Sequence, residues 1–239
     1  MTTSQSELQL STSFTSAGDR VTRAGLFALP AYGVLTFLAA LNPQPDPTVD
    51  YDAWARFVTT PQYFLSHLLG SALGLILAVF GTFALGAYLT RGRSSRLGLT
   101  AMAITVLGDL LFLFMMALST FAAPAGARAY LAGVRNIDQL QQDTLADTAG
   151  ALIFVLVILL SFTGNVLLGL AIWRSAILPR VAGMLWIASA VALYALGLVI
   201  GALITHDSPP TEPIGALLVA ISGTWIAWSA RPHPVEVLR

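Results

Sequence analysis

The strongest constraint on this chain is a series of long apolar segments that contain almost no charge. Six of them approach or exceed the roughly 20 residues that cross a hydrocarbon core of about 30 Å. Only 10% of the 239 residues are charged and 56% are hydrophobic, whereas about a quarter of the residues in a soluble domain are charged. The segments are 24–41, 62–90, 97–123, 147–173, 181–204 and 213–230. The sequence therefore predicts an all-α fold, a polytopic transmembrane six-helix bundle.

The arginines are distributed unevenly over the two sides of such a bundle. If the six segments alternate in direction, nine arginines lie on the side that holds both chain ends and three lie on the other side. Short loops rich in basic residues stay in the cytoplasm. We therefore expect both termini to be cytoplasmic. Residues 1–23 are predicted to be a disordered cytoplasmic tail, 24–230 the six-helix transmembrane domain, and 231–239 a second cytoplasmic tail.

One loop resembles a known group of proteins. The run GLAIWRSAILPRVAGMLWIASA, residues 169–190, is similar to the helix, RSGxLPRWAG-like loop and helix of many uncharacterised multi-pass membrane proteins of high-GC Gram-positive bacteria. Ala176 stands where glycine is usual in that pattern, and Val181 where tryptophan is usual. The resemblance covers about a tenth of the chain. It implies a small multi-pass protein of the bacterial inner (plasma) membrane and names no activity.

The longest loop on the predicted outer side is 124–146. Its apolar residues recur at helical spacing, which predicts one short amphipathic helix at the outer surface. Most of the acidic residues also lie on this side. Their excess has three interpretations: an ordinary lack of selection against acids, an attraction for cations, or contact with a partner.

A single aspartate stands out within the third apolar segment. The stretch TVLGDLLFLFMMAL, residues 105–118, contains Asp109 and no other charge. At 1.5 Å per residue, Asp109 lies about 18 Å from Leu97 and about 21 Å from Ala123, close to the bilayer midplane. A charge there costs roughly 2.5–3.5 kcal/mol, so an ionisable residue in this position is a functional candidate. We expect Asp109 to face other helices and, without a cationic neighbour at its level, to be neutral.

Several polar side chains are predicted to lie near the depth of Asp109. Measured along each helix, Ser161 and Tyr194 lie at about its depth, and Asn165 and Thr105 lie about one turn nearer the cytoplasm. They form a predicted mid-membrane polar layer, with Asp109 as a catalytic candidate and the other four as ligand-binding candidates. Three roles remain open for Asp109: an interhelical hydrogen bond, proton or ion handling, and general acid catalysis.

His67 is the remaining candidate for ligand binding. It lies about 9 Å from the outer end of its helix and about 12 Å above Asp109, so we expect its neighbours to be Tyr63, Asp147 and the outer loop. The chain has no cysteine, and its three histidines show no ligand spacing. We therefore predict no metal site and no cofactor.

The activity itself is unresolved, and three classes of function remain open. The best fit is an integral membrane protein that binds or moves a small or lipid-like molecule through the polar layer. The second is an intramembrane enzyme in which Asp109 is a general acid on a lipid or isoprenoid substrate. The third is an accessory subunit that packs against a membrane protein partner. The expected partners are the lipid bilayer and one such ligand or protein, and a net charge of zero gives no signal for nucleic acid.

Overall fold

The chain folds into helices joined by short connections. A computed structural model describes residues 17–42, 44–134, 136–146, 148–200 and 211–231, and these residues contain helices and no strand. Three segments, named η, are wide π-helical turns within longer helices. The elements are α2 (Ala28–Ala40), α3 (Tyr51–Val58), α4 (Pro61–Leu65), η1 (Ser66–Leu73), α5 (Gly74–Leu89), α6 (Ser95–Ala117), η2 (Leu118–Ala122), α7 (Ala123–Leu131), α8 (Ile137–Ala146), α9 (Thr148–Arg174), α10 (Arg180–Ala190), η3 (Val191–Leu196), α11 (Gly197–Ile200) and α12 (Thr211–Ser229).

Four continuous helices are long and apolar enough to cross a membrane. They cover Ala17–Ala40, Pro61–Leu89, Ser95–Leu131 and Gly150–Arg174, and a shorter apolar helix covers Arg180–Leu196. Their outward faces carry large apolar side chains, and Phe80, Phe114 and Leu159 are more than half exposed. An apolar surface of this kind is stable in lipid and not in water. The prediction of an all-helical membrane protein is therefore confirmed.

The first helix begins earlier than the sequence indicated. It starts at Ala17, so residues 17–23 are helical and the predicted disordered tail is corrected over that range; residues 1–16 lie outside the described part. An ion pair of 2.6 Å joins Asp19 Oδ1 on this extension to Arg91 Nη2 beyond the end of α5. The helix is interrupted at Phe27. Pro30 explains the interruption, because it has no N–H for the carbonyl of Leu26, four residues earlier.

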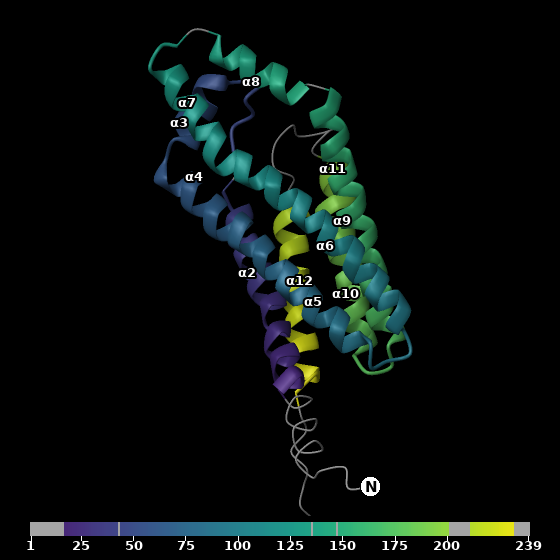
Figure 1. Cartoon of the computed structure of the whole chain (residues 1–239). Helices are drawn as coiled ribbons and strands as arrows, with labels where there is room; N and C mark the ends of the chain where they lie inside the picture. The colour runs from purple at the N-terminus through teal and green to yellow at the C-terminus, as the bar shows by residue number, and fades with distance from the viewer. Residues whose placement is uncertain (1–16, 43, 135, 147, 201–210, 232–239) are drawn as a thin grey trace, which may run out of the picture.

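The long helices pack in a closed order, in which each contacts two neighbours. The sequence of contacts runs from α2 to α5, α6, α9, α10 and α12, and α12 returns to α2. Figure 1 shows α2, in purple, directly beside α12, in yellow, although they lie at opposite ends of the chain. A buried apolar cluster fills the space between the helices of this closed order, and it includes Leu29, Leu85, Ile172, Trp186 and Ile226. The closed order encloses an interior in which polar side chains can be shielded from lipid.

Short helices cover one end of the bundle. In Figure 1, α3, α7 and α8 lie at the end opposite to the start of α2 and the end of α12. The single amphipathic helix predicted for 124–146 is corrected to two helices. Its first part, α7, continues α6 through η2, and positive φ angles at Gly133 and Asn136 mark the turn into α8. The helix that begins with α6 runs past Pro124, which follows the wide turn η2.

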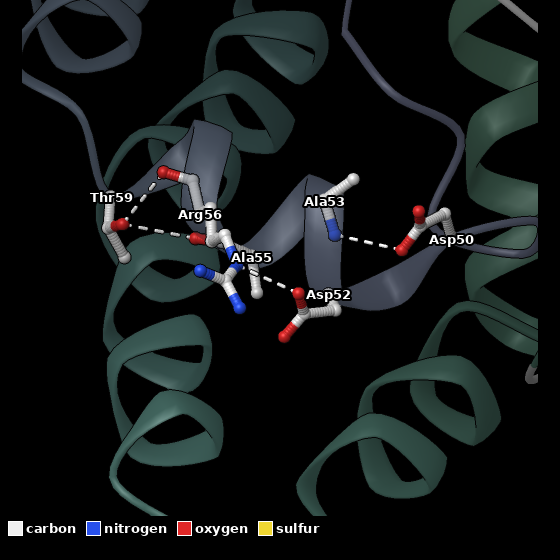
Figure 2. Close-up of polar contacts among 6 residues, drawn as sticks. All are labelled: Asp50, Asp52, Ala53, Ala55, Arg56 and Thr59. Carbon is white, nitrogen blue, oxygen red and sulfur yellow. Dashed lines mark hydrogen bonds and ion pairs between the residues drawn. The ribbon is translucent and has the colours of Figure 1, made fainter.

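Local hydrogen bonds stabilise α3, one of the short helices that cover this end of the bundle. Figure 2 shows the Asp50 carboxylate accepting a bond of 2.9 Å from the Ala53 N–H at the start of this helix, and Arg56 reaching Asp52 one turn away. The Thr59 hydroxyl bonds to main-chain carbonyls at its other end. An aspartate N-cap is worth about 1 kcal/mol. The result is a short helix held at a defined position, where it packs on α7.

Candidate functional site

Asp109 faces the interior of the bundle. Its residue is 2% exposed, whereas Leu107 and Leu110 on either side are about half exposed. No arginine or histidine forms an ion pair with it among the described residues. The carboxyl is therefore enclosed by protein at the middle of α6 without a cationic partner.

Two glycines bring α6 and α9 into close contact at this level. A Cβ atom on Gly108 would lie 2.8 Å from Ser161 Oγ, and one on Gly164 would lie 2.6 Å from the backbone nitrogen of Thr105. The absence of side chains lets the two backbones approach, as at other small-residue helix crossings. The crossing buries the Thr105 and Ser161 side chains beside Asp109.

The hydroxyls at this crossing are incompletely paired. Neither Thr105 Oγ1 nor Ser161 Oγ has a partner with full hydrogen-bond geometry, although the Tyr194 side chain lies within reach of Ser161. Most buried polar atoms in proteins are hydrogen-bonded. A buried hydroxyl without a partner, Thr105, and one that Tyr194 reaches, Ser161, make this crossing an unusually polar site within a membrane helix bundle.

Two tyrosines connect Asp109 to the opposite side of the interior. Tyr32 on α2 and Tyr194 on η3 are within hydrogen-bonding reach of each other, and both lie close enough to Asp109 to interact with it electrostatically. Tyr32 also reaches Thr36, one turn further along α2. Three of the predicted residues, Asp109, Tyr194 and Ser161, therefore meet in one cluster. Tyr32 was not among the residues predicted from the sequence. It lies one helical turn before Thr36, a polar residue of the first apolar segment near the depth of Asp109, and this spacing could have identified it.

Asn165 has a structural position outside this cluster. Its side-chain amide donates to the Ser161 carbonyl at 2.9 Å, and its Oδ1 accepts from the Trp186 indole N–H at 3.0 Å. The first bond lies within α9, and the second links α9 to α10. Asn165 thus uses its hydrogen-bonding groups within the protein, and the structure does not bring it to the Asp109 carboxyl.

His67 lies in η1, which directly follows α4, and its ring interacts with several neighbouring groups. The ring stacks on Tyr63 with centroids 3.9 Å apart, and Nδ1 lies 3.1 Å from the Tyr63 carbonyl oxygen. Because a carbonyl only accepts, Nδ1 carries the proton and Nε2 accepts from the Gln44 amide at 3.3 Å. Tyr63 was the predicted neighbour. The other predicted neighbour, Asp147, lies outside the described residues.

A cavity connects the region of His67 with the tyrosine cluster. Its volume is about 220 Å³. It reaches from Asn42 and Gln44, beyond the end of α2, to Tyr32, a distance of about 15 Å along this helix. Its lining is mixed polar and apolar and comprises Tyr32, Thr36, Ala39, Ala40, Asn42, Gln44, Phe57, Ser66, His67, Ser71, Leu75, Phe112, Met116, Ser119 and Glu212. Asp109 does not line the cavity, but Tyr32, which does, lies close enough to interact with it electrostatically.

All three π-helical turns contribute to this region. His67 and Ser71 lie in η1, Ser119 lies in η2, and Tyr194 lies in η3. Wide turns of this kind are rare and occur frequently at functional sites. Their gathering around one cavity and one polar cluster supports a binding role for this part of the molecule.

The charged side chain in the described lining of the cavity is an acidic one. Glu212 at the start of α12 is the carboxylate in the lining, and no arginine lines the cavity within the described part of the chain. Among the described residues, no group of three or more histidine or acidic side chains could hold a metal ion. The lining therefore disfavours anions and accommodates neutral or cationic molecules.

Comparisons with known proteins give no further identification. No protein-family model, no curated protein and no solved structure matches the chain. The resemblance of residues 169–190 to multi-pass proteins of high-GC Gram-positive bacteria therefore stays a prediction.

Proposed function

We propose that this protein is a six-helix transmembrane bundle of a bacterial inner (plasma) membrane, with both termini in the cytoplasm. The closed packing order of α2, α5, α6, α9, α10 and α12 supports six spans, with α10 continued by η3 and α11. The arginine-rich loops after α5 and α9 lie at the same end as the start of α2, which supports the orientation through the positive-inside rule. In this orientation the cavity lies in the outer half of the membrane.

The proposed function is the binding of a small neutral or cationic molecule in this cavity. The observation that carries the proposal is a cavity of about 220 Å³ that combines hydroxyl, amide, imidazole and carboxyl groups and ends at the Tyr32–Tyr194–Asp109 cluster. An apolar cavity of about 150 Å³ holds benzene, so this one holds a molecule only slightly larger. The volume is too small for a lipid chain, which favours a small polar ligand over a lipid-like one.

The role proposed for Asp109 is indirect. A ligand in the cavity contacts Tyr32, and Tyr32 interacts with Asp109, so the carboxyl responds to the ligand through the tyrosine. A general acid has to reach the atom that it protonates, and Asp109 does not line the cavity. This geometry favours binding or coupled movement over the alternative of an intramembrane enzyme with Asp109 as the acid.

A cavity-filling variant tests the proposal. Ser71 lines the cavity, and Ser71→Leu places three additional carbon atoms there, whereas Thr100→Leu on the exposed face of α6 adds bulk away from the cavity. The assay follows thermal unfolding in mild detergent with a panel of small amines, amides, polyols and carboxylates. A ligand at 100 times its Kd stabilises the folded state by about 2.7 kcal/mol.

We expect at least one amine or neutral compound to raise the unfolding midpoint of the wild-type protein and of Thr100→Leu, but not that of Ser71→Leu. Carboxylates should have no effect, because the only charge in the described lining is acidic. A panel without any stabilising compound, or equal responses of Ser71→Leu and the wild type, would refute the proposed binding site.

A further inference from the structure

A second hollow lies at the other end of the bundle and has the opposite charge. It has a volume of about 410 Å³ and is lined by Arg93, Ser94, Ser95, Arg96, Leu97 and Arg174. It lies where the loop between α5 and α6 meets the end of α9. None of its three arginines forms an ion pair with a carboxylate in the described residues, where the ion pairs are Arg56–Asp52 and Arg91–Asp19. Three guanidinium groups without a counter-charge repel one another and favour an anion between them.

The walls of this arginine hollow are fixed by hydrogen bonds between the two loops. The Ser94 hydroxyl donates to the Ala171 carbonyl at 2.7 Å, and the Arg93 N–H donates to the Ser175 carbonyl at 3.2 Å. Gly92 packs so closely that a Cβ atom there would lie 2.6 Å from the Ser175 oxygen. The arginines therefore extend from a rigid base, which reduces the entropy lost when an anion binds.

The start of α6 adds main-chain donors to the same hollow. Ser94 is the N-cap residue, yet its hydroxyl makes no capping bond because it is used by Ala171. The first three residues of this 23-residue helix, Ser95, Arg96 and Leu97, all line the hollow. Free N–H groups and the helix dipole at this position favour a negative charge. They supplement the arginines as donors to anionic oxygens.

The hollow lies beside apolar surface that faces lipid. Leu99, on the first turns of α6, is 44% exposed, and Trp173, next to Arg174, is 43% exposed. Indole rings favour the level of the lipid headgroups, so this end of the bundle is at the membrane surface. Basic pockets between helices at this level bind anionic headgroups. We propose that the arginine hollow binds the phosphate of an anionic phospholipid.

Binding of phosphatidylglycerol to the detergent-purified full chain, measured by native mass spectrometry, tests this site. Phosphatidylcholine provides a zwitterionic lipid control, and inorganic phosphate provides a free anion. The double variant Arg96→Gln, Arg174→Gln removes two guanidinium groups, and Arg180→Gln removes an exposed arginine that does not line the hollow. An arginine near a membrane surface contributes about fivefold to lipid affinity, so the double variant should bind phosphatidylglycerol roughly 25-fold more weakly.

A second variant separates lipid binding from folding. Ser95→Asp introduces a carboxylate in the first turn of α6, where a negative charge favours the helix but repels a phosphate. We expect unchanged or increased thermal stability together with lost preference for phosphatidylglycerol, while Arg180→Gln behaves as the wild type. Equal affinity of the double variant and the wild type for phosphatidylglycerol would overturn the proposal. Tight binding of inorganic phosphate without any preference between the two lipids would overturn the assignment to a lipid.

Discussion

The close crossing of α6 and α9 predicts that an alanine substitution will affect the stability of the protein differently at two glycines. Gly164 and Gly74 both lie inside long helices, but a Cβ atom would meet different surroundings at each. At Gly164 it would lie 2.6 Å from the backbone nitrogen and from Oγ1 of Thr105, whereas at Gly74 its nearest neighbour would be Thr36 Oγ1 at 3.5 Å. Gly164→Ala therefore overlaps a rigid backbone, and Gly74→Ala makes ordinary contacts.

The expected changes in the free energy of unfolding follow from two opposing contributions. Alanine is about 1 kcal/mol more favourable than glycine inside a helix, and this applies to both variants. At Gly164 the two helices must also separate by roughly 0.8 Å to restore an ordinary contact, and overpacking of this kind costs about 1–3 kcal/mol. Gly164→Ala should therefore be less stable than Gly74→Ala by about 2 kcal/mol.

The assay is equilibrium unfolding in mixed detergent micelles, followed by the fluorescence of the five tryptophans. Gly74→Ala should unfold at the same or a higher denaturant concentration than the wild type, and Gly164→Ala at a lower one. If Gly164→Ala were stabilised as much as Gly74→Ala, the helices would not touch at this point. The location of the polar cluster beside Asp109 would then be wrong as well.

Two further predictions concern single polar groups. Trp186→Phe removes the indole donor to Asn165 Oδ1 and leaves this buried acceptor unpaired. The free energy of unfolding, measured in the same assay, should therefore fall by about 1–3 kcal/mol. A loss below about 0.3 kcal/mol would exclude this bond as a link between α9 and α10. Glu212 carries the charge in the described cavity lining, so Glu212→Gln should weaken the binding of amines more than that of neutral compounds in the thermal-unfolding assay with the ligand panel. Equal responses of Glu212→Gln and the wild type to amines would contradict this role.

Much of the architecture could be predicted from hydropathy, because each membrane helix has to satisfy its own backbone and present apolar side chains to lipid. The residues at which the helices begin and end were less predictable. Residues 17–23 are polar, yet they continue the first helix, and the ion pair between Asp19 and Arg91 is a long-range contact that no local pattern reveals. The merging of 123–131 with α6 likewise depends on packing of α7 against α3.

The polar cluster was predictable in part from depth along the helices. Counting residues from the helix ends placed Ser161 and Tyr194 at the level of Asp109, and the structure brings all three together. The depth of a residue along a helix does not show, however, on which side of the helix its side chain lies. Asn165 faces Trp186 instead of Asp109, and Trp186 is buried in the core. The cavity and its carboxylate, Glu212, depend on tertiary packing and had no sequence signal.

The wide turns η1, η2 and η3 affect how substitutions in this protein will behave. Each accommodates more residues per turn than the surrounding α-helix, so residues beyond it are rotated relative to the register that a regular helix would give. Removing one residue from such a turn would restore regular winding and leave the remainder of that helix in nearly its present orientation, whereas removing one residue from a regular turn would rotate the remainder by about 100°. A single codon deletion in 191–196 would thus keep the lipid-facing and inward-facing sides of the following segment, while the same deletion in the regular helix at 101–108 would turn inward-facing side chains of α6 towards lipid.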